Sequence, residues 1–204
     1  MTKKQNRQTE VFKRYTSIQT RDIDEAKRQV ELSFSSEEPY DRWFGPEILS
    51  HKDGAMNLTR LNEIGCLLFN HDKDKVIGRI ENAWIQENRG HALVTFDEDE
   101  ASDLIYQKVK SGTLKGVSVG YRVDSWEEVS TGKTSSDGSH VGPCSVALRW
   151  SPHEISIVSV PADATVGVGR DIGSSILPEQ MARSEPKALY YKQLQINQNY
   201  VGGK

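Results

Sequence analysis

The 204-residue sequence has only two cysteines, no long apolar run and little excess of charge of either sign. Two cysteines without metal-type spacing favour neither a zinc site nor a disulfide scaffold, and they fit a reducing, cytoplasmic setting. No segment approaches the roughly 20 apolar residues of a membrane span, and we find no secretion signal. The net charge of −3 gives no general reason to expect a nucleic acid as partner.

Both ends of the chain are polar, whereas the middle carries the apolar periodicity that a core requires. Residues 1–22 have a basic start and no periodicity, so we interpret them as a flexible tail. Residues 166–204 have no clear core periodicity either and are interpreted as a second tail. This leaves residues 23–165 as a single domain, long enough to bury a sizeable core.

Short segments with strand-like patterns dominate the central region. One good helix is predicted near residues 101–109, because acids precede it, lysines lie near its end and Gly112 follows. Residues 58–61 fit either a short helix or an irregular turn. The sum is a mainly β, α+β fold, either a barrel or a sandwich that carries helices. Strands are predicted at 30–34, 66–69, 76–84, 91–96, 116–123, 146–148 and 155–160, with 76–84 and 91–96 forming a hairpin.

The segment 116–121 places Ser118 between two glycines in a run that otherwise indicates a buried strand. Side chains alternate between the two faces of a strand, so Ser118 shares its face with Gly116 and Gly120. A face without neighbouring side chains allows another backbone to approach closely. This arrangement suits a nucleophile that meets an extended peptide, and it also suits a tightly packed barrel corner.

The same residues match the G-x-S-x-G pattern of the nucleophile elbow in α/β-hydrolases. An elbow needs a strand before the serine and a helix after it. Here a predicted helix precedes the serine, and residues 121–123 continue the strand pattern. We therefore interpret the elbow match as accidental and keep an unrelated elbow hydrolase only as a disfavoured alternative.

A nucleophilic serine needs a base, and usually a third group that orients this base. Among five histidines, His71 follows an apolar strand that would deliver it to the edge of the core, and His153 opens a late strand. Glu154 lies at the mouth of this late strand and needs a partner there. Arg149 or a backbone cap is the ordinary partner, and the alternative is that Glu154 orients an imidazole.

Metal binding is disfavoured by the same segments. His71 with Asp72 and Asp74, and His153 with Glu154, contain plausible ligand types. No spacing matches a known metal loop, and Lys73 and Lys75 would oppose a cation. We therefore expect neither a metal nor another cofactor.

Four segments in order give the chain a specific resemblance. They are Phe34-Ser35-Ser36-Glu37-Glu38-Pro39 with Asp41-Arg42-Trp43, Leu67-Leu68-Phe69-Asn70-His71-Asp72 with Ile77-Gly78, Gly112-x-Leu114-x-Gly116-Val117-Ser118-Val119-Gly120-Tyr121, and Glu154-Ile155-Ser156-Ile157-Val158-Ser159-Val160-Pro161-Ala162. Together they cover roughly residues 28–165. On these segments the chain resembles the prohead, or capsid maturation, serine proteases of tailed bacteriophages, which are distantly related to herpesvirus assemblin.

The resemblance implies a herpesvirus-protease-like β-barrel with surrounding helices. It implies that His71 is the catalytic histidine and that Ser118 is the nucleophile. The implied third member is Glu154, although assemblin uses a second histidine, which makes the adjacent His153 a rival. Gly116 and Gly120 would then clear the face on which a substrate strand lies.

The resemblance also implies a biological role. A serine endopeptidase of this kind cleaves the scaffold protein and the major capsid protein precursor inside the assembling prohead, in the host cytoplasm. Self-cleavage is expected, with residues 166–204 as an accessible self-cleavage or scaffold-docking segment, and a homodimer is a further expectation. No nucleic acid or membrane partner is implied. The alternative within the resemblance is an inactive capsid-assembly or scaffolding protein on the same barrel.

Overall fold

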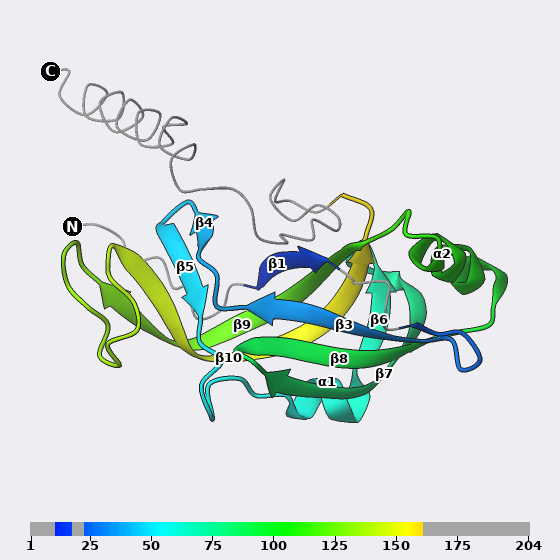
Figure 1. Cartoon of the computed structure of the whole chain (residues 1–204), viewed down its shortest axis with the longest axis horizontal. Helices are drawn as coiled ribbons and strands as arrows, with labels where there is room; N and C mark the ends of the chain where they lie inside the picture. The colour runs from blue at the N-terminus through cyan, green and yellow to red at the C-terminus, as the bar shows by residue number, and fades with distance from the viewer. Residues whose placement is uncertain (1–10, 18–22, 161–204) are drawn as a thin grey trace, which may run out of the picture. The chain divides into compact units, whose positions relative to one another are not determined.

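A computed structural model of the chain describes residues 11–17 and 23–160 (Figure 1). The predicted C-terminal tail, residues 166–204, lies outside the described residues. Within the described part, strands are the main element and two helices accompany them, as the mainly β prediction requires. Neither of these helices is long and apolar enough to cross a membrane.

The longest strands are β7, β9 and β10, and the strands that precede β7 are shorter (Figure 1). The elements are β1 (Phe12–Ser17), β2 (Ile23–Asp24), β3 (Gln29–Ser36), β4 (Tyr40–Arg42), β5 (Gly45–Leu49), α1 (Thr59–Ile64), β6 (Cys66–Phe69), β7 (Asp72–Gln86), β8 (Arg89–Phe96), α2 (Glu100–Lys110), β9 (Gly116–Val129) and β10 (Cys144–Val158).

The strands form one sheet whose hydrogen-bonded path runs β1-β9-β10-β6-β7-β8-β3-β2, with β4 and β5 attached to β10. The sheet is not closed, so the expected barrel is corrected to an open, curled sheet. Its strands β1 and β3 contact each other without pairing. Near the end of β3, the Arg14 guanidinium donates to the Glu38 carbonyl, so a side chain rather than a backbone ladder connects the two edges.

The predicted N-terminal tail contains β1, which corrects the expected boundary at residue 23. β1 pairs antiparallel with β9, and its register places Tyr15 opposite Ser118. Phe12 and Arg14 are both buried. The buried Arg14 breaks the apolar-polar alternation expected of this strand, because a charged residue is normally predicted to face the solvent.

The other predicted elements are confirmed with shifted ends. The hairpin is formed by β7 and β8, and the predicted helix is α2, whose N-cap Asp99 accepts from two backbone N–H groups. The ambiguous segment after residue 57 contains α1. The two strands predicted at 146–148 and 155–160 are one strand, β10, with register shifts between Ala147 and Glu154. Polar residues at these irregular positions interrupt the pattern on which the prediction rests.

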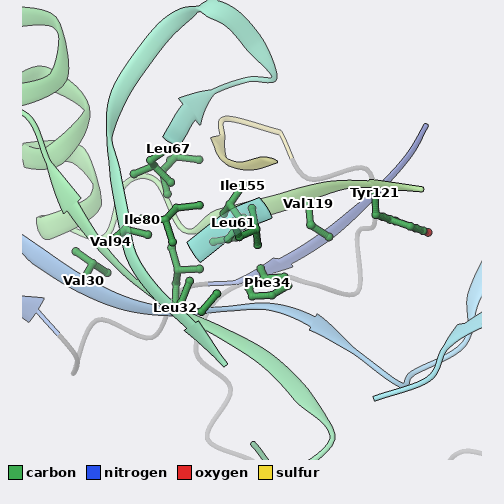
Figure 2. Packing of buried hydrophobic residues seen from close by; sticks show 14 of the residues in the cluster. Val30, Leu32, Phe34, Leu61, Leu67, Ile80, Val94, Val119, Tyr121 and Ile155 are labelled. Atoms are coloured by element: carbon green, nitrogen blue, oxygen red, sulfur yellow. The ribbon is translucent and has the colours of Figure 1, made fainter. Parts of the chain in front are cut away.

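The inner face of the sheet holds the main core. Figure 2 shows Val119 of β9 and Ile155 of β10 packed among residues from β3, β6, β7 and α1. Val117, Val119, Ile155 and Ile157 are fully buried, and they alternate with the residues on the opposite face of β9 and β10. Burial of such side chains contributes about 1.5–3 kcal/mol each and determines which face of β9 carries Ser118.

One buried histidine lies outside the segments expected to do chemistry. His51 is 3% exposed, its Nε2 lies 2.7 Å from Ser35 Oγ and its Nδ1 lies 2.9 Å from the Leu49 carbonyl. The carbonyl can only accept, so Nδ1 carries the proton and Ser35 donates to Nε2. The pKa of His51 is lowered from 6.5 to about 4, mainly by burial and also by the charges of Arg14 and Arg89.

We predict that His51 makes the fold sensitive to mild acid. Its folded pKa lies below the unfolded one, so the unfolded chain binds the extra proton between pH 6.5 and 4. The free energy of unfolding should therefore fall by up to about 3 kcal/mol as the pH decreases through this window. Urea unfolding at several pH values measures this slope. His51→Gln should flatten it and the control His91→Gln should not; equal slopes in both variants would contradict the prediction.

Candidate active site

His71 sits in a two-residue hairpin turn between β6 and β7. Phe69 pairs with Asp72, and both central residues have positive φ, 54° at Asn70 and 60° at His71. Turns of this kind match the twist of the flanking strands but require left-handed backbone, which asparagine tolerates best after glycine. Asn70 holds the turn against β10, because its N–H donates to the Ile157 carbonyl and its Oδ1 accepts from the Ser159 N–H.

The turn places His71 against Glu154 of β10. His71 Nδ1 lies 2.6 Å from Glu154 Oε1, and the side chains are 8% and 20% exposed, respectively. An ionised carboxylate can only accept, so Nδ1 carries the proton in this hydrogen bond and Nε2 of the neutral ring holds the lone pair. The geometry therefore fixes both the orientation and the tautomer of the imidazole. Glu154 takes this partner in place of Arg149 or a backbone cap.

Gly120 makes room for the Glu154 carboxylate. It lies directly opposite Glu154 in the β9–β10 register. A Cβ atom at position 120 would clash with Glu154 Oε1, the oxygen that receives the His71 hydrogen bond. We expected this glycine to clear space for a substrate strand. The structure fills that space with the carboxylate, so the absence of a side chain at Gly120 serves the His71–Glu154 contact.

Ser118 lies on the same face of the sheet as this pair. Its register partner on β10 is Ser156, and Gly120 with Glu154 forms the next pair on that face. Ser118 is fully buried, and its Oγ has no hydrogen-bond partner within residues 11–17 and 23–160. β9 continues to Val129 without a helix after the serine, which agrees with rejecting the nucleophile elbow.

His153 occupies a different environment from Glu154. It falls at the register shift between Pro152 and Glu154, where the β10 ladder is interrupted. Burial lowers the pKa of His153, and the charge of Arg122 lowers it further. Its Nε2 has no hydrogen-bond partner in the described part of the chain. The structure therefore brings His71 to Glu154 and leaves His153 outside this contact.

Ser156 and Asn70 also hold the site together, and the sequence analysis did not predict either residue. Ser156 Oγ donates to Glu154 Oε2 at 2.7 Å and lies 3.2 Å from the His71 backbone nitrogen. Asn70 holds the turn, as described above. The alternation of β10 places Ser156 on the face of Glu154, so this residue was accessible to strand reasoning. The role of Asn70 follows only from the hairpin turn, whose exact length the sequence pattern did not reveal.

Metal binding and thiol chemistry find less support in the described part of the chain. Among residues 11–17 and 23–160, no group of three or more histidine, cysteine, aspartate or glutamate side chains is arranged to hold a metal ion. Burial raises the pKa of the Cys144 thiol, which disfavours the reactive thiolate. The arrangement around His71 is instead an imidazole whose orientation and tautomer are fixed by a carboxylate, which is what a general base requires.

Comparison with known families and proteins gives three matches. A model of the family described as caudovirus prohead serine protease matches residues 47–172, more than half of the chain and a range that contains His71, Ser118 and Glu154. The chain is 38% identical over 143 residues to a major capsid protein of Halomonas phage phiHAP-1. This alignment covers 68% of the chain but 23% of that protein, so the chain spans about a quarter of this relative's length.

The third match is a solved structure. The fold is similar to that of the bacteriophage T4 capsid assembly protease, with a TM-score of 0.51 and 14% sequence identity. The superposition covers 74% of this chain and 98% of that one. At this identity the likeness concerns the fold alone.

We predict that Gly120→Ala separates Glu154 from His71 while the sheet persists. The added methyl group must displace the carboxylate, and overpacking of this kind costs about 1–3 kcal/mol. Thermal unfolding measures the loss of stability, and the low-field proton resonance of His71 Nδ1 reports on the hydrogen bond. In a Glu154→Ala background the cost of Gly120→Ala should largely disappear. An equal cost in both backgrounds would show that the carboxylate is not the obstacle.

Proposed function

The chain belongs to the caudovirus prohead serine protease family, and from this premise we propose that it is a serine endopeptidase of prohead maturation. The observation that carries the proposal is the 2.6 Å hydrogen bond between His71 and Glu154, on the face of the sheet that presents Ser118. It supports the assignment of His71 as general base, Ser118 as nucleophile and Glu154 as the residue that orients the base.

In the proposed first step, His71 Nε2 takes the proton of the Ser118 hydroxyl. The resulting oxygen nucleophile attacks the carbonyl carbon of the scissile peptide bond and forms a tetrahedral intermediate. Glu154, which accepts from Nδ1, stabilises the imidazolium that forms and keeps the ring in the productive tautomer. The proton on Nδ1 stays there, because the carboxylate acts by its charge.

In the second step, the intermediate collapses and the peptide C–N bond breaks. His71 donates its Nε2 proton to the departing amine, and the carbonyl carbon remains attached to Ser118 as an ester. A water molecule then gives a proton to His71 and attacks the ester carbon. The bond between this carbon and the Ser118 oxygen breaks, His71 returns the proton to that oxygen, and the new carboxyl end is released. Backbone N–H groups that stabilise the oxyanion would contribute about 2.7–4 kcal/mol per donor.

The proposed substrates are the scaffold protein and the major capsid protein precursor, processed inside the assembling prohead in the host cytoplasm. The family description and the similarity to a phage major capsid protein support this assignment. We also propose self-cleavage, with residues 166–204 as the accessible segment or as a scaffold-docking segment. Dimerisation belongs to the same proposal.

A second candidate is a catalytically inactive capsid-assembly protein on the same fold. One observation favours it: the relative with 38% identity is a major capsid protein. The burial of Ser118 is compatible with either candidate, since a closed site and an unused site both cover the hydroxyl. The two candidates differ in what happens when the hydroxyl is removed.

Co-expression with the capsid precursor distinguishes the candidates. We predict that Ser118→Ala lowers precursor processing by at least about a thousandfold, because the hydroxyl is the attacking group. Gel mobility and mass spectrometry of the precursor measure processing. Ser151→Ala serves as a control, because it removes a half-buried serine hydroxyl from β10. Processing that is equal in wild type and Ser118→Ala would overturn the protease assignment and favour the inactive assembly protein.

A further inference from the structure

The proposed mechanism gives no role to the hydroxyl group of Ser156, although this hydroxyl hydrogen-bonds to both Glu154 and the backbone of His71. Ser156 is fully buried near the C-terminal end of β10. Its Oγ lies 2.7 Å from Glu154 Oε2 and 3.2 Å from the His71 backbone nitrogen, and its register partner on β9 is Ser118. No other described side chain hydrogen-bonds to both the carboxylate and the turn that carries His71.

The direction of both hydrogen bonds follows from the chemistry of the groups. An ionised Glu154 can only accept, so Ser156 must donate its single proton to Oε2. The backbone N–H of His71 can only donate, so it uses a lone pair of the same hydroxyl. These two bonds fix the orientation of the hydroxyl. The hydroxyl connects Glu154 Oε2 to the His71 backbone, while the His71 ring binds Glu154 Oε1.

This closed arrangement restrains two groups that would otherwise move. Glu154 has rotatable bonds and only one ring nitrogen to hold it, so a second donor on Oε2 fixes the plane of the carboxylate. His71 has a left-handed backbone, which costs about 1–3 kcal/mol and persists only where the surroundings determine it. The hydrogen bond from its N–H to Ser156 is one of the contacts that hold the backbone in this conformation.

We propose that Ser156 is a positioning residue of the site, acting on His71 and Glu154 together rather than on the substrate. The inference rests on the proposed protease function and deepens it. Ser156→Ala removes the donor to Glu154 and the acceptor for the His71 N–H in one step. The ring then loses its fixed placement beside Glu154, and a displacement of about 1 Å at such a site lowers the rate roughly a hundredfold.

Three serine variants test the inference on cleavage of the capsid precursor. Ser156→Ala should lower kcat roughly ten- to a hundredfold and leave KM nearly unchanged, because the substrate does not touch the hydroxyl. The pH profile of kcat/KM should change as well, because this profile reports on the base and on the groups that hold it. Ser156→Thr retains a hydroxyl and should restore most of the rate.

Ser145→Ala is the matched control. Ser145 is buried on the same strand and donates to Glu128 Oε2 at 2.7 Å, so its removal breaks a comparable hydrogen bond in another part of β10. It should change neither the rate nor the pH profile. If Ser156→Ala matches Ser145→Ala in both, the inference is overturned.

A measurement that does not need cleavage separates this inference from the function on which it rests. The low-field proton resonance of His71 Nδ1 should be lost or shifted in Ser156→Ala and retained in Ser145→Ala and Ser118→Ala. If cleavage proves independent of Ser118 while this resonance pattern holds, the protease assignment fails and the positioning role of Ser156 stands. An unchanged resonance in folded Ser156→Ala, verified by its melting temperature, would reject the positioning role.

Discussion

The hydrogen bond between His71 and Glu154 is the interaction on which the candidate site depends. Two backbone features make this hydrogen bond possible, and each of them lowers the stability of the fold. A two-residue hairpin turn holds His71 in the left-handed region, and Gly120 omits the Cβ atom that would occupy the place of the carboxylate. The site therefore depends on the pairing of β6 and β9 with the two edges of β10 as much as on its polar side chains.

The alternation of β9 and β10 divides this part of the sheet into a face that packs in the core and a face that carries the candidate site residues. Val119 and Ile155 belong to the core, whereas their neighbours Ser118 and Glu154 point to the opposite face. A slip of one residue in the register would exchange the two faces, so burial of the apolar set fixes the position of the polar set. Core packing and the placement of the candidate site residues are thus linked through the strand register.

Sequence reasoning named the candidate residues, but it did not predict the contacts that hold them. The face of Ser118 follows from alternation, and His71 and Glu154 from the resemblance to a protease family. The strand β1 was missed because Arg14 points inward, where a polar residue hides the pattern. The open edge between β1 and β3 and the partnership of Gly120 with Glu154 depend on contacts between distant segments, which single-sequence patterns do not contain.

The account predicts that orientation of His71 comes from Glu154 and not from the neighbouring His153. The most direct measurement is kcat/KM for precursor cleavage by Glu154→Gln and His153→Ala, each verified as folded by its melting temperature. Glu154→Gln should lose about a thousand- to ten-thousandfold, as expected when the base loses its charged partner and its tautomer. His153→Ala should stay close to wild type. A large loss in His153→Ala with near-normal activity of Glu154→Gln would contradict the account.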